Sequence, residues 1–203
     1  MKKKTLMVLL VVLFLVPAGL FAGIFDLSIG AIAQYNGIIG SENATWEEGM
    51  SEIDNYEFGP DIRMRILFAE VDIAALYSST NTGHRLSGIA TGGVSLDLLG
   101  LLRLGVGMGP RLSVTFDDDW SNAQAYGPNN VAISGGSDFG TAFMNAPMSY
   151  RITADLKLGK ILLGLNYTID SDGFTFEQSN FDQLMPNFDN GGNLGASVLF
   201  TLF

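Results

Sequence analysis

Charged residues alternate with apolar residues in several stretches of the chain, and their types suggest the chemistry to consider first. They are six bases and five acids: Arg63, Arg65, Arg103, Arg111, Arg151, Lys157, Asp26, Asp61, Asp72, Asp97 and Asp155. On a β-strand, side chains at alternate positions share a face. Charges gathered on one face inside a protein must pair, because an unpaired buried charge is very costly. We therefore expect a charge network of ion pairs at these positions rather than a reactive centre.

A hydrolase is the catalytic alternative that the histidine content suggests. His84 is the only histidine, and Ser78, Ser79 and Ser87 lie near it in the sequence. A serine beside a base can act as a nucleophile, and some outer-membrane lipid-modifying enzymes use a serine with a histidine. No carboxylate that could orient His84 lies near it in the sequence. We expect a solvated loop histidine and no enzyme.

Two acidic runs and one glycine run resemble ligand-binding motifs only in part. Asp117 to Asp119 and the run from Asp170 to Gly173 are rich in oxygen and could hold Ca²⁺, but neither completes a ligand loop. The glycines of 105–109 resemble part of a dinucleotide fingerprint, yet they do not open a helix. Small residues there would leave room for long arginine side chains. With no cysteine in the chain, we expect no disulfide, no metal and no cofactor.

Composition and the first residues set the class of protein. The chain has 203 residues, 47% of them hydrophobic, and a formal net charge of -10, so one domain is expected and nucleic acid is not an expected partner. Lys2 to Lys4 precede an apolar run from Leu6 to Val16, and Pro17 and small residues follow up to Ala22. This layout predicts a signal peptide over 1–22 and a mature domain over 23–203, with an uncleaved anchor as the alternative.

Strict alternation of apolar residues with polar residues or glycine predicts the strands that position the charges. It is most regular over 102–116, and seven further strands are expected at about 25–35, 58–68, 71–77, 88–98, 148–158, 161–169 and 194–202. Each is near the 9–11 residues that a tilted transmembrane strand needs. Long connections (36–57, 80–87, 117–147 and a loop to about 192) alternate with tight turns at 69–70, 100 and 159–160.

This pattern predicts an all-β, eight-stranded antiparallel up-and-down transmembrane β-barrel with both termini periplasmic. The apolar face would contact lipid, and the charges would line the lumen. Aromatic residues at the strand ends beside the long loops predict an outer girdle: Tyr35, Phe58, Tyr77, Phe116, Tyr150 and Tyr167. Pro60 and Pro110 cannot donate a ladder hydrogen bond, so we expect a bulge at each.

With these features, the chain resembles the small eight-stranded outer-membrane barrels, namely the OmpX-like, OmpA-transmembrane-like and OmpW-like families. The resemblance covers the mature chain and includes a terminal aromatic residue, Phe203. It implies that the barrel-assembly machinery reads Phe203, and that the protein lies among outer-membrane lipids of a diderm (Gram-negative) envelope with its loops at the cell surface. An OmpW-like barrel would be a porin-like channel for small hydrophobic molecules, with Ile32, Leu67 and Leu76 as hints of an apolar lumen.

The leading functional prediction is a non-enzymatic outer-membrane barrel with a charge-plugged lumen and a structural or surface-interaction role. Its long loops are acidic and aromatic, and we assign Glu57, the single base Arg85, Trp46 and Trp120 to them. An extracellular ligand is therefore a possible partner class. The alternative is OmpW-like transport of small hydrophobic molecules, and a lipid-modifying hydrolase is third.

Overall fold

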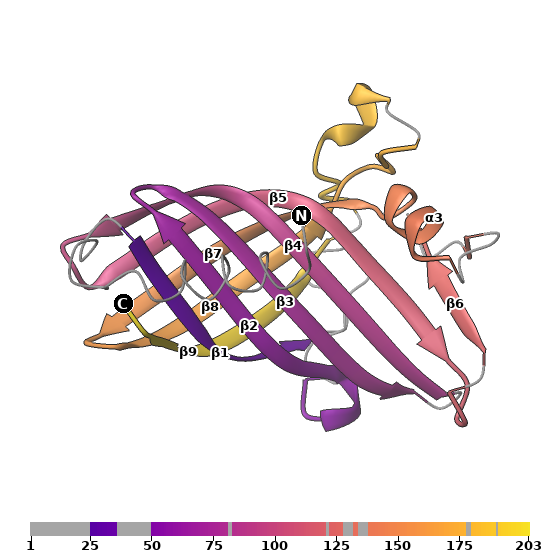
Figure 1. The fold of residues 1–203 in the computed structure, drawn as a ribbon, viewed down its shortest axis with the longest axis horizontal. Helices are drawn as coiled ribbons and strands as arrows, with labels where there is room; N and C mark the ends of the chain where they lie inside the picture. Colours follow the sequence, from indigo (N-terminus) through magenta and orange to yellow (C-terminus); the bar gives the residue numbers. More distant parts are fainter. Residues whose placement is uncertain are drawn as a thin grey trace, which may run out of the picture.

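The protein forms an antiparallel β-barrel in the computed structural model, which describes residues 25–35, 50–80, 83–120, 122–127, 132–133, 138–177, 180–189 and 191–203. The strands of the wall are β1 (Phe25–Tyr35), β2 (Tyr56–Ile66), β3 (Ala69–Thr80), β4 (Gly83–Leu98), β5 (Leu102–Phe116), β7 (Met148–Leu158), β8 (Ile161–Asp170) and β9 (Asn193–Thr201). Each pairs with the next, and β1 pairs with β9 to close the ring (Figure 1). The predicted signal peptide and Trp46 lie outside the described residues.

Two ends of the barrel differ in their connections (Figure 1). The tight turns and the C-terminus lie at one end, called the turn end below. The other end, called the loop end, carries η2 (Ile53–Asn55), β6 (Ala123–Tyr126), α3 (Phe139–Met144) and η4 (Phe181–Leu184). Within the described ranges, no helix combines the length and apolar composition needed to cross a membrane.

The predicted eight-stranded antiparallel up-and-down barrel is confirmed by this pairing. Its faces follow the alternation in the sequence. Large apolar side chains such as Leu165 (60% exposed) and Val198 (58%) point outward, whereas Arg63 and Asp61 point inward and are 1% and 0% exposed. The exterior is therefore apolar and the interior is polar, as in barrels that cross an outer membrane.

The turn between β2 and β3 differs from the prediction. We expected Ala69 and Glu70 to form it, but Leu67 and Phe68 do, and β3 already begins at Ala69. Leu67 takes a left-handed conformation with φ 58°, which leucine rarely adopts. Both turn residues are apolar, so the sequence has no turn signal at this point and the strand was predicted to continue to Phe68. Leu67 consequently lies at the rim and is no part of the lumen.

The connection between β3 and β4 is also shorter than predicted. The loop expected over 80–87 is wrong, because Gly83 to Ser87 belong to β4 and pair with β3. Arg85 and Ser87 take the inward parity of this strand, while His84 and Leu86 take the outward parity. Polar residues on both faces made this segment look like a loop.

The long connection over 117–147 contains regular structure that the alternation did not predict. Strand β6 pairs with the loop end of β5, and α3 follows it. Asp138 caps α3 by accepting a hydrogen bond from the backbone N–H of Thr141 at 2.9 Å. This bond, together with one from the Thr141 hydroxyl, lowers the pKa of the exposed Asp138 carboxyl.

Neither proline introduces a bulge, contrary to the prediction. Between β2 and β3, the pairs Phe58–Tyr77 and Asp61–Ala74 flank Pro60 and are three residues apart on both strands. No extra residue is therefore inserted at Pro60. Strands β4 and β5 likewise keep one register across Pro110. The missing proline N–H therefore leaves a gap in the ladder without shifting the strands.

A glycine precedes each proline, and the neighbouring strand approaches it closely. A Cβ on Gly59 would lie 1.8 Å from the carbonyl oxygen of Ala75, and a Cβ on Gly109 would lie 1.8 Å from that of Ala90. These carbonyls lie in space that only a glycine leaves free, as also happens at Gly30 and Gly93, where no proline follows.

Candidate functional site

Charged side chains fill the central part of the lumen, where β2, β3 and β7 face one another. We call Asp61, Arg63, Asp72, Arg151 and Asp155 the middle cluster. Arg63 donates from Nη1 to Asp155 Oδ1 at 2.6 Å and from Nη2 to Asp61 Oδ2 at 3.0 Å. Arg151 donates from Nη1 to Asp72 Oδ1 at 3.2 Å. All five side chains are at most 5% exposed.

A second group of charges lies near the turn end, and we call it the turn-end cluster. Its centre is Asp97, which accepts from Arg103 Nε at 2.8 Å and Lys157 Nζ at 2.7 Å, and lies 2.8 Å from Arg65 Nη1. Arg103 also donates from Nη2 to Asp26 Oδ2 at 2.5 Å. Charge-assisted hydrogen bonds of this kind are the stronger ones.

Arg111 lies nearer the loop end than the other lumen bases. Its Nη1 donates to Asn193 Oδ1 at 2.7 Å and lies 3.8 Å from Asp170 Oδ1. The eleven charged residues selected from the sequence thus lie in the lumen at three levels. Ten of them form ion pairs with one another, and Arg111 instead contacts Asn193 and Asp170.

Three further lumen residues were missed because the strands were drawn too short. Glu57 (1% exposed) and Glu70 (7%) lie in β2 and β3, and Arg85 lies on the inward face of β4. Ser78 Oγ donates to Glu57 Oε1 at 3.3 Å. Glu57 lies two positions before Gly59, and Glu70 lies two positions before Asp72, on the inward parity of each strand. Extending the alternation by these two positions in each strand would have placed both glutamates in the lumen.

One layer of the lumen is apolar. Ile32, Ala74, Leu76 and Ile89 are buried and form one cluster between β1, β3 and β4. The sequence indicated Ile32 and Leu76 as lumen residues, and they do lie inside. These side chains therefore make one layer of the lumen apolar between levels that are charged.

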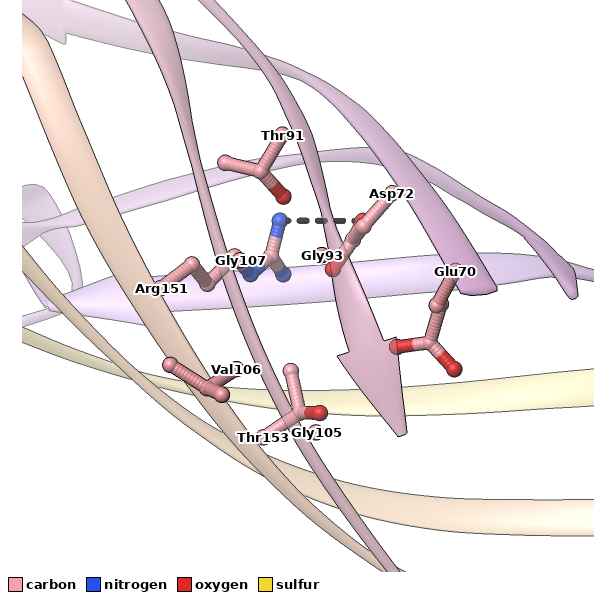
Figure 2. A pocket seen from close by; sticks show the side chains of 9 residues that line it. All are labelled: Glu70, Asp72, Thr91, Gly93, Gly105, Val106, Gly107, Arg151 and Thr153. Atoms are coloured by element: carbon pink, nitrogen blue, oxygen red, sulfur yellow. Dashed lines mark hydrogen bonds and ion pairs between the residues drawn. The ribbon is translucent and has the colours of Figure 1, made fainter. Parts of the chain in front are cut away.

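A small cavity opens in the lumen beside the middle cluster (Figure 2). Glu70, Asp72, Arg151 and Thr153 approach it, and the wall of β4 and β5 lacks bulk there because Gly93, Gly105 and Gly107 line it. The space holds about one water molecule. The glycines of 105–109 lie within β5 and do not form the turn between a strand and a helix that a dinucleotide fingerprint requires. Gly105 and Gly107 instead leave space in the lumen.

His84 lies on the outer surface near the loop end. Its Nδ1 is 2.9 Å from the Tyr77 hydroxyl, and its ring stacks on Trp120 at 4.4 Å between centroids. Ser78 and Ser87 are buried on the opposite face of the wall. Ser78 and Ser87 are therefore out of reach of His84, whereas Ser79 lies directly across from it on the outer face of β3. The hydrogen bond of His84 Nδ1 is with Tyr77.

Aromatic residues of the predicted girdle have different surroundings. Phe58 and Tyr77 are exposed on the outer face, as expected. Tyr35 is buried against Tyr56, which corrects its predicted contact with lipid. Tyr150 donates its hydroxyl to the carbonyl oxygen of Leu184 at 2.6 Å. Loop segments thus cover part of this rim.

The remaining girdle residues and the terminal aromatic also have aromatic or loop neighbours. The ring centroids of Phe116 and Trp120 are 5.3 Å apart. The Tyr167 ring packs against Gly192, where an added Cβ would lie 2.6 Å from its Cζ atom. The ring centroids of Phe203 and Phe25 are 6.2 Å apart, so Phe203 lies beside the start of β1.

The acidic runs contain hydrogen-bonded carboxylates. Asp117 accepts from Asn122 at 2.5 Å, and Asp172 accepts from Asn187 at 2.8 Å. Across the ranges that the structure describes, no three His, Cys, Asp or Glu side chains are grouped so that they could hold a metal ion. The calcium interpretation of these runs therefore gains no support.

Comparisons with known proteins give no evidence for a particular function of this chain. No protein-family model matches the chain, and no curated protein matches it. Among solved structures, the crystal structure of Neisserial surface protein A is similar over 88% of this chain and 96% of that chain, with 14% sequence identity and a TM-score of 0.39. At these values the likeness carries no functional argument, and the barrel is established by its own strand pairing.

Proposed function

We propose that this chain is a non-enzymatic outer-membrane barrel with a lumen closed by ion pairs and loops that act at the cell surface. The apolar exterior supports the membrane location, because only closed barrels and helices satisfy every backbone group in lipid. The periplasmic termini and the reading of Phe203 by the assembly machinery belong to the same proposal.

The middle cluster is the observation that carries the closed lumen. Arg63 and Arg151 extend from β2 and β7 toward carboxylates on other strands, and both are 1% exposed. Eight strands leave an interior only just wide enough for side chains. Five large charged side chains that bond across this space leave no room for a stream of hydrated ions.

The loop end supports a role in surface interaction. It presents exposed apolar side chains together with acidic ones; the apolar set is Phe139, Phe181, Met185 and Phe188, and the acidic set includes Asp117, Asp118, Asp172, Asp182 and Asp189. Exposed aromatics are frequent anchors in binding surfaces. An extracellular protein or ligand is the partner class that this surface suits.

Conductance across a planar lipid bilayer tests the closed lumen. We expect purified protein to give no steady channels. Replacing both Arg63 and Arg151 with alanine removes the two bases of the middle cluster and should produce measurable current, whereas Arg111→Ala at the loop end should not. Large stable channels in the unmodified protein would contradict the proposal, even if the double variant fails to fold.

A second candidate function is binding of small hydrophobic molecules at the loop end of the lumen. The apolar cluster of Ile32, Ala74, Leu76 and Ile89 favours it. A small apolar fluorophore should gain fluorescence in vesicles that contain the protein, relative to empty vesicles. Leu76→Asn should remove this gain, and the outward-facing Leu86→Asn should retain it. Equal fluorescence in both kinds of vesicle would exclude this candidate.

A further inference from the structure

Three buried oxygen-bearing side chains meet in the lumen wall without partners. They are Glu70 on β3, Ser95 on β4 and Thr153 on β7, which are 7%, 1% and 3% exposed. Among the described residues, Glu70 Oε2, Ser95 Oγ and Thr153 Oγ1 have no hydrogen-bond partner. Asp72 Oδ2 and Arg151 Nη2 beside them also lack a hydrogen bond, but each lies 3.6 Å from an opposite charge. Buried polar groups are nearly always satisfied, so the three oxygens without such a neighbour point to a bound species.

Gly105 provides the space between these side chains. It pairs with Ser95 on one side and Thr153 on the other, so both flank it directly. A Cβ at Gly105 would lie 2.5 Å from Thr153 Oγ1, 3.0 Å from Glu70 Oε1 and 3.5 Å from Ser95 Cβ. The point where any other residue would have its side chain is thus surrounded by oxygen-bearing groups. Glu70, Gly105 and Thr153 line the same cavity (Figure 2).

The charge balance of this region favours a cation. In the described middle and turn-end parts of the lumen, acids outnumber bases by one: Asp26, Asp61, Glu70, Asp72, Asp97 and Asp155 against Arg63, Arg65, Arg103, Arg151 and Lys157. Arg65 is the cross-strand partner of Glu70, but its guanidinium lies 2.8 Å from Asp97. Arg63 and Arg151 are within 4 Å of aspartates, and no base in this part of the lumen forms an ion pair with Glu70. A buried carboxylate with no counter-charge is very costly.

The donor set indicates which cation fits. One carboxylate and two hydroxyls are hard oxygen ligands with a single negative charge, and the space suits a water-sized occupant. Divalent cations take several carboxylates, and no group of three such metal-binding side chains occurs in the described ranges. We propose that Glu70, Ser95 and Thr153 bind a monovalent cation of about the size of Na⁺ in the space that Gly105 leaves.

Thermal unfolding of the complete barrel in lipid vesicles tests this site. A ligand that binds only the folded state raises Tm with the logarithm of its concentration. We expect Tm to be about 5 °C higher in NaCl than in N-methylglucamine chloride of equal ionic strength. N-methylglucamine serves as the comparison because it is too large for the cavity. Equal Tm values in the two salts would overturn the proposal.

Variants distinguish this site from a general salt effect. Glu70→Gln removes the charge and Gly105→Ala fills the space, so both should lose the Na⁺ dependence of Tm. Gly92→Ala is the matched control, because no atom lies within 4 Å of its added Cβ, and it should keep the full dependence. Retention of the dependence by Glu70→Gln, or its loss in Gly92→Ala, would contradict the site.

A proton on Glu70 is the competing way to neutralise the charge, and the same assay separates the two. In that case the Tm of the unmodified protein would respond to pH but not to Na⁺, which would overturn the cation proposal. Relaxation of the ²³Na nucleus with the unmodified protein gives a second measurement if a variant does not fold. We expect the protein to broaden the ²³Na resonance, and this broadening should persist in excess K⁺ but disappear in Gly105→Ala. The absence of any broadening would count against the site. The site does not depend on whether the lumen conducts.

Discussion

Arg63 shows how one side chain connects distant strands. From β2 its guanidinium reaches Asp61 on its own strand, Asp155 on β7 and Ser197 on β9. These contacts join residues separated by up to 134 positions in the sequence. Because the guanidinium has several donors in a fixed plane, it can serve these partners at once. Its removal would leave Asp155 without its ion pair and Asp61 with Arg151 alone.

Substitution of Arg63 tests this dependence. Arg63→Met keeps most of the apolar stem but leaves Asp61 and Asp155 less compensated, so we expect the free energy of unfolding to fall by about 3–5 kcal/mol. Urea unfolding in lipid vesicles, followed by tryptophan fluorescence, measures it. Arg65→Met is the control on the same face of β2. Its partner Asp97 keeps Arg103 and Lys157, so its loss should be about 1 kcal/mol. A similar loss in both variants would contradict this account.

At the scale of strands, the paired Gly-Pro steps in β2 and β5 are the least regular parts of the wall. Each proline removes one ladder donor, and the glycine before it lets the neighbouring strand's carbonyl approach. A Cβ at either glycine would overlap that carbonyl. The two positions are therefore more sensitive to added bulk than their exposure suggests.

A methyl group at one of these glycines should disrupt strand pairing. Gly109→Ala would bring its Cβ to 1.8 Å from the Ala90 carbonyl oxygen, so we expect a lower yield of folded barrel on refolding into vesicles. Electrophoretic mobility without heating reports the folded fraction. Gly88→Ala on the adjacent strand meets no atom within 4 Å and should fold like the unmodified protein. Normal folding of Gly109→Ala would show that β4 and β5 can move apart there.

The sequence predicted the strands wherever alternation and a turn signal coincided. The bounds of β1, β5 and β7 agree with the expected ranges, and Gly159 in the turn after β7 has φ 65°. The β2–β3 turn was misplaced because Leu67 and Phe68 carry no turn chemistry. That error put Glu70 in a turn, and the late start expected for β4, at residue 88 instead of Gly83, put Arg85 in a loop.

The site followed the same pattern. Parity alone put Asp61, Arg63 and Asp155 in the lumen, since alternate residues of a strand share a face. Which of them bond could not be predicted, because the contacts depend on strand tilt and on how far opposite walls stagger. The cavity beside Gly105 is lined by four strands, β3, β4, β5 and β7, and no pattern within one strand indicates it.

At the scale of the whole molecule, the wall is taller on one side. At the loop end, β7 reaches only as far as its first residue, Met148, which pairs with Pro110 of β5. Strands β4 and β5 continue beyond this level, and β6 pairs with β5 there, from Ser113 to Phe116. Figure 1 shows β6 and α3 standing beyond the barrel at this end. If the loop end faces outward, this raised side is the part of the protein that reaches furthest from the membrane.

Proteolysis of intact cells tests this orientation. A protease that cuts after aromatic residues should cleave near Phe139, which is 72% exposed at the loop end. Phe68 at the opposite end is also exposed, and it should be cut only after the outer membrane is permeabilised. Mass spectrometry of the fragments identifies both sites. Cleavage at Phe68 with protection of Phe139 in intact cells would mean that the barrel is inserted the other way round.

The pairing of β1 with β9 also determines when this molecule can exist during its synthesis. Ser28 bonds to Thr201 at 2.9 Å across that seam, and Gly195 is opposite Gln34. Until β9 has been synthesised, every nascent intermediate has two unpaired strand edges, which lipid does not tolerate. Contacts of such high sequence separation also form slowly. The ring can therefore close only after β9 has been synthesised, so a closed barrel cannot grow strand by strand from β1.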